Sequence, residues 1–179
     1  LEADRGTTLL AIAEQIGPRL AKAAYVAEVD GGVVDLSRRV ESDAQIRILT
    51  ERDPETLEVY RHSTAHLMAQ AVQRLWPDTK VTIGPVIEDG FFYDFERDEP
   101  FTPDDFPAIE AEMDKIVMED HAIEREEISR RDALSLFREM KEPYKVEIIE
   151  DLPEDQTLTV YRQGEWVDLC RGPHVPRTG

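Results

Sequence analysis

The chain has 179 residues, of which 41% are hydrophobic and only 7% aromatic, a composition ordinary for one or two folded domains that excludes disorder as the first expectation. Lys and Arg number 21 against 39 Asp and Glu, so the net charge of -18 disfavours nucleic acid as a partner when bulk charge alone is considered. A single cysteine excludes an internal disulfide, and no apolar run approaches the roughly 20 residues of a membrane-spanning helix, so we expect a cytoplasmic protein without a secretory signal.

The opening segment carries the pattern of a small α+β module. Apolar residues recur at helical spacing before Gly17-Pro18, a typical stop signal, and Asp30-Gly31-Gly32 is a typical hairpin turn. The expected elements are a helix at 7–16, hairpin strands at 25–29 and 33–36, and a further strand at 45–49. We therefore assign residues 1–52 to a first domain.

A long helix is expected to open the second domain, residues 53–179. Asp53 is placed to cap its free amide groups, and Pro54 suits the first helical position. Apolar residues at helical spacing continue to Trp76, where Pro77 ends the pattern. A helix of this length is expected to be central to the domain.

The remainder of the chain predicts an antiparallel sheet with two further helices. Thr102-Pro103 and Ser129 carry helix start signals. The expected strands are 81–87 and 91–95, joined as a hairpin by Glu88-Asp89-Gly90, and then 144–149, 157–161 and 165–169. The predicted fold class is α+β, with the long helix packed on the antiparallel sheet.

Three of the four histidines and the only cysteine fall in two short motifs that lie more than 100 residues apart, His62-Ser-Thr-Ala-His66 and Cys170-Arg-Gly-Pro-His174. On a helix, positions i and i+4 face the same side, so both imidazoles of the first motif can converge on one point. The Gly-Pro pair of the second motif excludes a regular helix and predicts a tight loop at the end of a strand. Such a loop can direct the side chains of Cys170 and His174 toward the helix.

Three interpretations of these four residues remain open at this point. In the first, the histidines are satisfied helix residues and Cys170 is a small apolar filler, a reading with roughly half the weight for an isolated HxxxH motif. In the second, three imidazoles and one thiolate form a tetrahedral zinc site. In the third, neutral imidazoles position and deprotonate a water in a hydrolytic pocket without obligatory metal.

The combination of motifs resembles the editing domain of threonyl-tRNA synthetases. The resemblance rests on HSTAH with CRGPH, linked through IGPVIEDGFFYDF and EPYKVEII. Alanyl-tRNA synthetases carry a related editing domain, but it follows their catalytic core, whereas here a ubiquitin-like (TGS) module precedes it. That module is similar to the family's own but lacks its opening hairpin. The resemblance covers essentially the whole chain.

The resemblance implies a role for each matching residue. The residues that match the family pocket are His62, His66, Tyr93, Lys145, Asp168, Cys170 and His174, with Arg171 beside the tRNA end. Among them, the resemblance implies that His62 activates water and that Lys145 holds the water or the substrate. From the sequence alone, a solvated strand lysine is the commoner role for Lys145, and a surface acid is about as common for Asp168. Ordinary packing or solvation is the alternative for Tyr93 and Arg171.

The function implied by the resemblance is hydrolysis of serine wrongly attached to threonine tRNA. A missing methyl is worth only about 1 to 3 kcal/mol in a binding pocket, so a threonine synthetase needs a second, hydrolytic sieve. The partner is the acceptor end of tRNA(Thr), no membrane is implied, and zinc is not required for editing. ATP, zinc and a homodimer interface are expected only in family domains absent from this chain. Acidic residues concentrate in 88–127, which we expect to face away from RNA.

Two rival functions remain open. One is a zinc-stabilised structural or tRNA-binding module without turnover, in which His62, His66, Cys170 and His174 are structural ligands. The other is an alanyl-type or free-standing editing deacylase, which the ubiquitin-like module disfavours.

Overall fold

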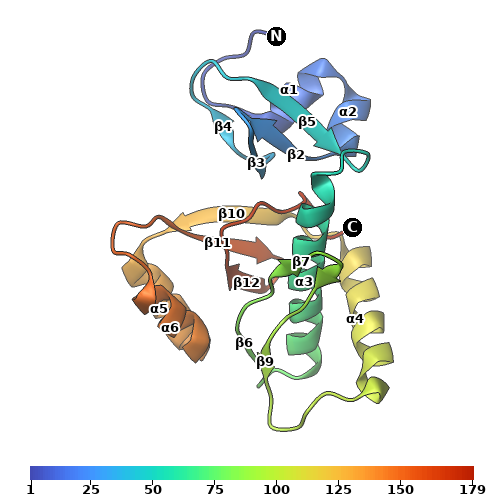
Figure 1. Ribbon diagram of the computed structural model, residues 1–179, viewed down its shortest axis with the longest axis vertical. Coiled ribbons are helices and arrows are strands. Elements are labelled where there is room, and N and C mark those ends of the chain that lie inside the picture. Colours follow the sequence, from blue (N-terminus) through green and yellow to red (C-terminus); the bar gives the residue numbers. More distant parts are fainter. The chain divides into compact units, whose positions relative to one another are not determined.

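The computed structural model describes residues 1–179, which divide into two compact units. The first comprises Leu1–Ser63 with Gly172–Pro176, and the second comprises Thr64–Arg171 with Arg177–Gly179. Helices and antiparallel sheets are both present, which confirms the predicted α+β class (Figure 1). None of the helices combines the length and the apolar character needed to cross a membrane.

The first unit contains a three-stranded antiparallel sheet in the order β3-β2-β5. Its elements are β1 (Thr7–Thr8), α1 (Leu9–Ile16), α2 (Pro18–Ala23), β2 (Ala24–Val29), β3 (Gly32–Asp35), β4 (Arg39–Val40) and β5 (Ile46–Thr50). The predicted helix, hairpin and third strand are confirmed. Gly17-Pro18 does end the first helix, but Pro18 also begins α2 at its first position, where a missing N–H donor costs nothing.

The long predicted helix is α3 (Thr56–Leu75). The predicted cap at Asp53 is wrong, because its carboxylate accepts hydrogen bonds from the Thr50 amide and hydroxyl at 2.7 and 3.1 Å. The side chain therefore closes a turn before the helix. Only the Asp53 carbonyl receives the amide of Thr56, at 3.0 Å.

A second three-stranded antiparallel sheet, in the order β10-β11-β12, forms the platform of the second unit. Its strands are β10 (Ile123–Ile128), β11 (Leu158–Gln163) and β12 (Trp166–Leu169), and the helices α5 (Arg130–Glu139) and α6 (Pro143–Asp151) pack against it (Figure 1). Ser129 caps α5 as expected, since its hydroxyl accepts the amide of Asp132 at 3.1 Å. The buried side chains of Phe137, Ile149 and Val160 join helices and sheet in one core.

Two expectations for this sheet differ from the structure. The segment 144–149, predicted as a strand, lies in helix α6. The alternation of apolar residues there was misleading, because the buried positions are Glu142, Lys145 and Ile149, at helical spacing. Conversely, β10 was not predicted: its sequence IEREEI is mostly charged, and the four central residues of this edge strand are exposed.

The predicted hairpin around Glu88-Asp89-Gly90 is present as two short ladders. They are formed by β6 (Lys80–Val81) with β9 (Phe95–Glu96), and by β7 (Val86–Ile87) with β8 (Gly90–Phe91). Pro85 lies in the interruption between the ladders and has no amide to donate. Backbone bonds between Asp94 and both Thr82 and Ile83, each 3.1 Å, keep the two segments together across it.

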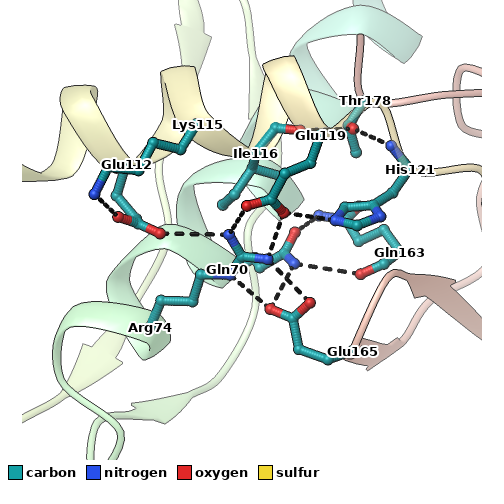
Figure 2. Close-up of polar contacts among 10 residues, drawn as sticks. All are labelled: Gln70, Arg74, Glu112, Lys115, Ile116, Glu119, His121, Gln163, Glu165 and Thr178. Carbon is teal, nitrogen blue, oxygen red and sulfur yellow. Dashed lines mark hydrogen bonds and ion pairs between the residues drawn. The ribbon is translucent and has the colours of Figure 1, made fainter.

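Helix α4 (Phe106–Glu119), which follows the short turn η1 (Pro103–Asp105), is joined to α3 through Arg74 (Figure 2). The Arg74 guanidinium donates to Glu119 at 2.8 and 3.0 Å and to Glu165 at 2.6 and 3.0 Å, and it reaches Glu112 at 3.4 Å. One cation thus fixes two helices and the turn between β11 and β12.

Candidate functional site

The first pair of motif residues, His62 on α3 and His174 in the C-terminal loop, brings two imidazole rings together. Their ring centroids lie 4.3 Å apart with a tilt of 34°. His174 is buried, and its backbone amide donates to Asp35 Oδ1 at 2.9 Å. A residue from each motif is therefore in direct contact, as predicted for a tight loop returning to the helix.

The tautomer of His174 follows from the hydrogen bonds of Ser63. The Ser63 hydroxyl donates its single proton to the Val59 carbonyl at 2.9 Å and accepts the amide of Val175 at 3.1 Å. His174 Nδ1 lies 3.1 Å from the same oxygen, so Nδ1 must be the donor in this contact. When the imidazole is neutral, the lone pair is therefore on His174 Nε2, which suits this atom to accept a hydrogen bond or to bind a metal.

In the second unit, the carboxylate of Asp168 on β12 is the centre of a buried polar cluster. Lys145 Nζ lies 2.6 Å from its Oδ1, the Leu169 amide donates to the same oxygen at 2.8 Å, and the Tyr93 hydroxyl donates to Oδ2 at 2.9 Å. Both Lys145 and Asp168 are only 2% exposed. The Lys145 ammonium also donates to the Thr82 carbonyl at 2.6 Å, so this lysine is neither on a strand nor solvated.

Tyr93 is held as a neutral phenol beside this pair. Burial, and secondly the charge of Asp168, raise the pKa of Tyr93 well above its ordinary value, so the hydroxyl remains a donor. Its ring stacks on Phe95 with centroids 4.9 Å apart. A Cβ at Gly84 would lie 2.3 Å from a Tyr93 ring carbon, so only glycine at position 84 permits this ring placement.

His66 adjoins the same cluster, and Cys170 follows Asp168 by two residues, directly after β12. His66 is buried, with Nε2 3.7 Å from Asp168 Oδ2 and its ring edge-on to Trp166 at a centroid distance of 5.3 Å. The Cys170 backbone is fixed to Thr159 by an amide-to-carbonyl bond of 3.1 Å and by a second bond from the Thr159 hydroxyl. Cys170 is the chain's single cysteine and is half-buried. A cavity of about 160 Å³ lies beside it, with exposed Arg171 in its lining.

The four motif residues also form one group. His62, His66, Cys170 and His174 each offer one ligand atom, and these atoms lie within 4.8 Å of one another. Three imidazoles and a thiol match the donor set and number of a tetrahedral zinc site, so the group is positioned to hold a metal.

Sequence reasoning missed the side chains that surround these residues. Gln73 on α3, Glu142 at the start of α6 and Trp166 on β12 are joined by hydrogen bonds behind His66, Lys145 and Asp168. Each of the three lies near a predicted site residue in the sequence. Glutamine and glutamate are common on helices, however, so Gln73 and Glu142 gave no signal that could be recognised. Only the scarcity of tryptophan, which occurs twice in the chain, was a usable signal.

Comparison with known proteins finds similarity along almost the whole chain. Residues 1–50 match the TGS domain, and residues 158–179 match the domain described as "Threonyl and Alanyl tRNA synthetase second additional domain". The threonine–tRNA ligase of Maricaulis maris is 59% identical over 97% of this chain and 27% of its own length. Those of Alkalilimnicola ehrlichii and Gluconobacter oxydans are 54% and 55% identical over 99% and 97% of the chain, respectively. The chain spans about a quarter of the length of these relatives, 28% and 26% for the latter two.

Proposed function

We propose that this chain, a homologue of the N-terminal part of threonine–tRNA ligases that carries TGS and editing-type domains, hydrolyses serine wrongly esterified to tRNA(Thr). The observation that carries the proposal is the grouping of three imidazoles and one thiol, His62, His66, Cys170 and His174. One of these residues, His66, lies 3.7 Å from the buried carboxylate of Asp168, which is fixed by Lys145 and Tyr93.

The chemistry needs one oriented water, a base and donors for the developing oxyanion. Imidazole is the side chain whose ordinary pKa, about 6.5, makes it a base near neutral pH, and we assign this role to His62. His174 contacts the His62 ring and, as the neutral tautomer set by Ser63, offers an acceptor that can help to orient the water. An ammonium has three donors, and Lys145 uses two on Asp168 and Thr82; the third is available for the oxyanion or the water.

Selectivity for serine is assigned to the walls of the pocket, His66, Tyr93, Asp168 and Cys170. The hydroxyl of serine can donate to Asp168, but threonine offers the same hydroxyl, so this contact does not distinguish them. The additional methyl of threonine must instead clash with a wall that cannot move. Tyr93 is such a wall, because Gly84, Phe95 and Asp168 confine its ring and hydroxyl.

The tRNA acceptor end is the proposed partner, and Arg171 is the proposed contact to it. Arg171 follows Cys170 directly and is exposed. We also propose that the acidic segment 88–127 forms a face directed away from RNA, since like charge repels the phosphate backbone.

A zinc-stabilised binding module is the second candidate, favoured by the same four residues. Zinc would be held by His62, His66, Cys170 and His174, and these four ligands would complete a closed tetrahedral site that stabilises the fold. Editing in our proposal does not require it. Metal quantification after prolonged chelation, beside a deacylation assay, separates the candidates: activity that vanishes with zinc and returns on its addition contradicts the metal-free proposal.

Deacylation of purified seryl-tRNA(Thr) tests the proposed function. The assay uses the 179-residue chain and, in parallel, a full-length threonine–tRNA ligase that contains it. His62→Ala is expected to lower the rate by about 10² to 10⁴-fold, the usual cost of losing a general base. An alanyl ester on tRNA(Ala) is the control for an alanyl-type deacylase, and preferential hydrolysis of that ester would reject the threonyl assignment.

A further inference from the structure

Gln73 forms hydrogen bonds with two segments of the second unit that each carry a residue of the proposed site, the start of α6 and strand β12. It lies on α3 seven residues after His66, which is two helical turns, so both side chains leave the same face. Its Nε2 donates to Glu142 Oε1 at 2.6 Å and to the Thr79 carbonyl at 3.0 Å. Its Oε1 accepts the indole N–H of Trp166 at 2.7 Å.

The orientation of the Gln73 amide is determined by these partners. An indole N–H only donates, so the amide oxygen must face Trp166, and the amide nitrogen must face the carbonyl and the carboxylate. Glutamine is the side chain that offers an acceptor and two donors from one end. Neither methionine nor glutamate at position 73 can satisfy the same three groups.

Through its hydrogen bond with Glu142, Gln73 is connected to the helix that carries Lys145. Glu142 is 3% exposed and immediately precedes α6, the helix on which Lys145 lies one turn later. Its second oxygen accepts the amide of Val81 at 3.2 Å. Because both carboxylate oxygens are bound, the start of α6 is tied to α3 and to β6.

Through its hydrogen bond with Trp166, Gln73 is also connected to His66 and to the strand that carries Asp168. Trp166 and Asp168 are two residues apart on β12 and therefore face the same side of the strand. The Trp166 ring also packs edge-on against the His66 ring. Fixing the indole N–H thus fixes both the wall behind His66 and the strand position from which Asp168 meets Lys145.

We propose that Gln73 is a positioning residue that, through Glu142 and Trp166, holds Lys145, Asp168 and His66 in the geometry that hydrolysis requires. The expected loss of kcat rests on the proposed function, whereas the expected change in the position of His66 does not. Gln73 touches none of the reacting groups, so its effect is on the step that needs alignment rather than on substrate binding.

Gln73→Met is the direct test, and Gln70→Met is the matched control. Gln70 is also a buried glutamine on α3 that binds the β11–β12 hairpin, through Gln163 and Glu165, but it forms no hydrogen bond with Trp166 or Glu142. We expect Gln73→Met to lower kcat for seryl-tRNA(Thr) by about 10 to 100-fold with KM little changed, the cost of a misalignment of about 1 Å. Gln70→Met is expected to lower stability while leaving kcat near that of the unaltered chain.

A second readout does not need turnover. The imidazole resonances of His66, recorded by NMR at one fixed pH in the same 179-residue chain, are expected to shift in Gln73→Met and to stay in place in Gln70→Met. Unaltered kcat and unaltered His66 resonances in folded Gln73→Met would overturn the inference, and so would equal kinetic losses in the two variants. If the unaltered chain does not hydrolyse the ester, the proposed function fails, and the His66 resonances alone decide the positioning role.

If Gln73→Met does not fold, a double variant that exchanges the amide and the carboxylate of residues 73 and 142, called the exchanged pair, provides a second test. Gln73→Glu places two carboxylates together and is expected to be inactive, whereas adding Glu142→Gln restores one amide and one carboxylate across the same contact. We expect the exchanged pair to recover folding and part of kcat relative to Gln73→Glu, since the contact with residue 142 returns while the Thr79 carbonyl still has no donor. A double variant that folds but is no more active than Gln73→Glu would contradict the proposed contact.

Discussion

The ammonium of Lys145 lies 2.6 Å from the carboxylate of Asp168, and the two side chains are almost fully excluded from solvent. A buried charge without its partner is costly, so removing one member of such a pair typically destabilises a protein by about 3 to 5 kcal/mol. We predict a loss of about 3 kcal/mol for Lys145→Met, measured by denaturant unfolding. We also predict loss of seryl-tRNA(Thr) hydrolysis.

The double variant Lys145→Met/Asp168→Leu separates stability from function. Because it removes both charges, we expect it to regain much of the stability lost in Lys145→Met. Hydrolysis is expected to remain absent, since no donor for the oxyanion returns. A double variant as unstable as the single one, or one that regains activity, would show that the pair does not act as described.

Gly84 is predicted to control the placement of Tyr93. Gly84→Ala would bring a methyl to 2.3 Å from the ring, so either the ring or the hairpin must move. We expect the Tyr93 bond to Asp168 to break, with a loss of about 1 to 3 kcal/mol in stability. Hydrolysis is expected to fall by about tenfold, measured as kcat/KM on seryl-tRNA(Thr).

Two companion variants make the Gly84 result interpretable. Gly17→Ala is the control glycine, since nothing lies within 4 Å of a Cβ built there and its φ of 167° suits any residue. Tyr93→Phe removes the hydroxyl but keeps the ring, and should therefore cost less activity than Gly84→Ala. The reverse order would mean that ring position is unimportant.

The Arg74 network predicts an acid-dependent part of stability. Hydrogen bonds from Arg74 are the main cause that lowers the pKa of Glu119 and of Glu165 to about 2, from an ordinary 4.5. Because these pKa values are depressed in the folded state, the stabilisation is complete above about pH 4.5 and is lost as the pH falls through about 2.

Replacing Arg74 with Met should flatten the dependence of unfolding free energy on pH across that window and lower stability above it. Urea unfolding at a series of pH values from about 2 to 6 measures both effects. Arg131→Met is the control, because its ion pair with Asp132 is on the surface, where such pairs contribute little. An unchanged pH dependence in Arg74→Met would show that the network does not stabilise the folded chain.

Local patterns predicted most of the helices and strands, and the failures have identifiable causes. The capping signals of Ser129 and the apolar spacing along α3 act within a few residues, so they are readable from the sequence. The segment 144–149 was misread because its apolar residues fit both periods, and only burial of Lys145 shows the helical one. Burial of a lysine depends on Asp168, a partner 23 positions away that periodicity does not reveal.

The candidate site could be predicted only in part, because many of its contacts also join residues that are distant in the sequence. Scarce residues in short motifs identified His62 and His174, whose rings are in contact. The side chains behind them, such as Gln73 and Glu142, are common residue types with no motif, and their contact joins positions 69 residues apart in the sequence. Their importance follows from hydrogen bonds that only the folded chain reveals.

Comparing the deacylation rates of seryl-tRNA(Thr) and threonyl-tRNA(Thr) under one set of conditions tests whether the pocket hydrolyses serine esters and excludes threonine by size. We predict that the unaltered chain, in a full-length threonine–tRNA ligase that contains it, hydrolyses the seryl ester and spares the threonyl ester. We also predict that enlarging the pocket by Tyr93→Ala or Cys170→Ala erodes this difference. Equal rates on the two esters in the unaltered protein would contradict a pocket that excludes threonine by size.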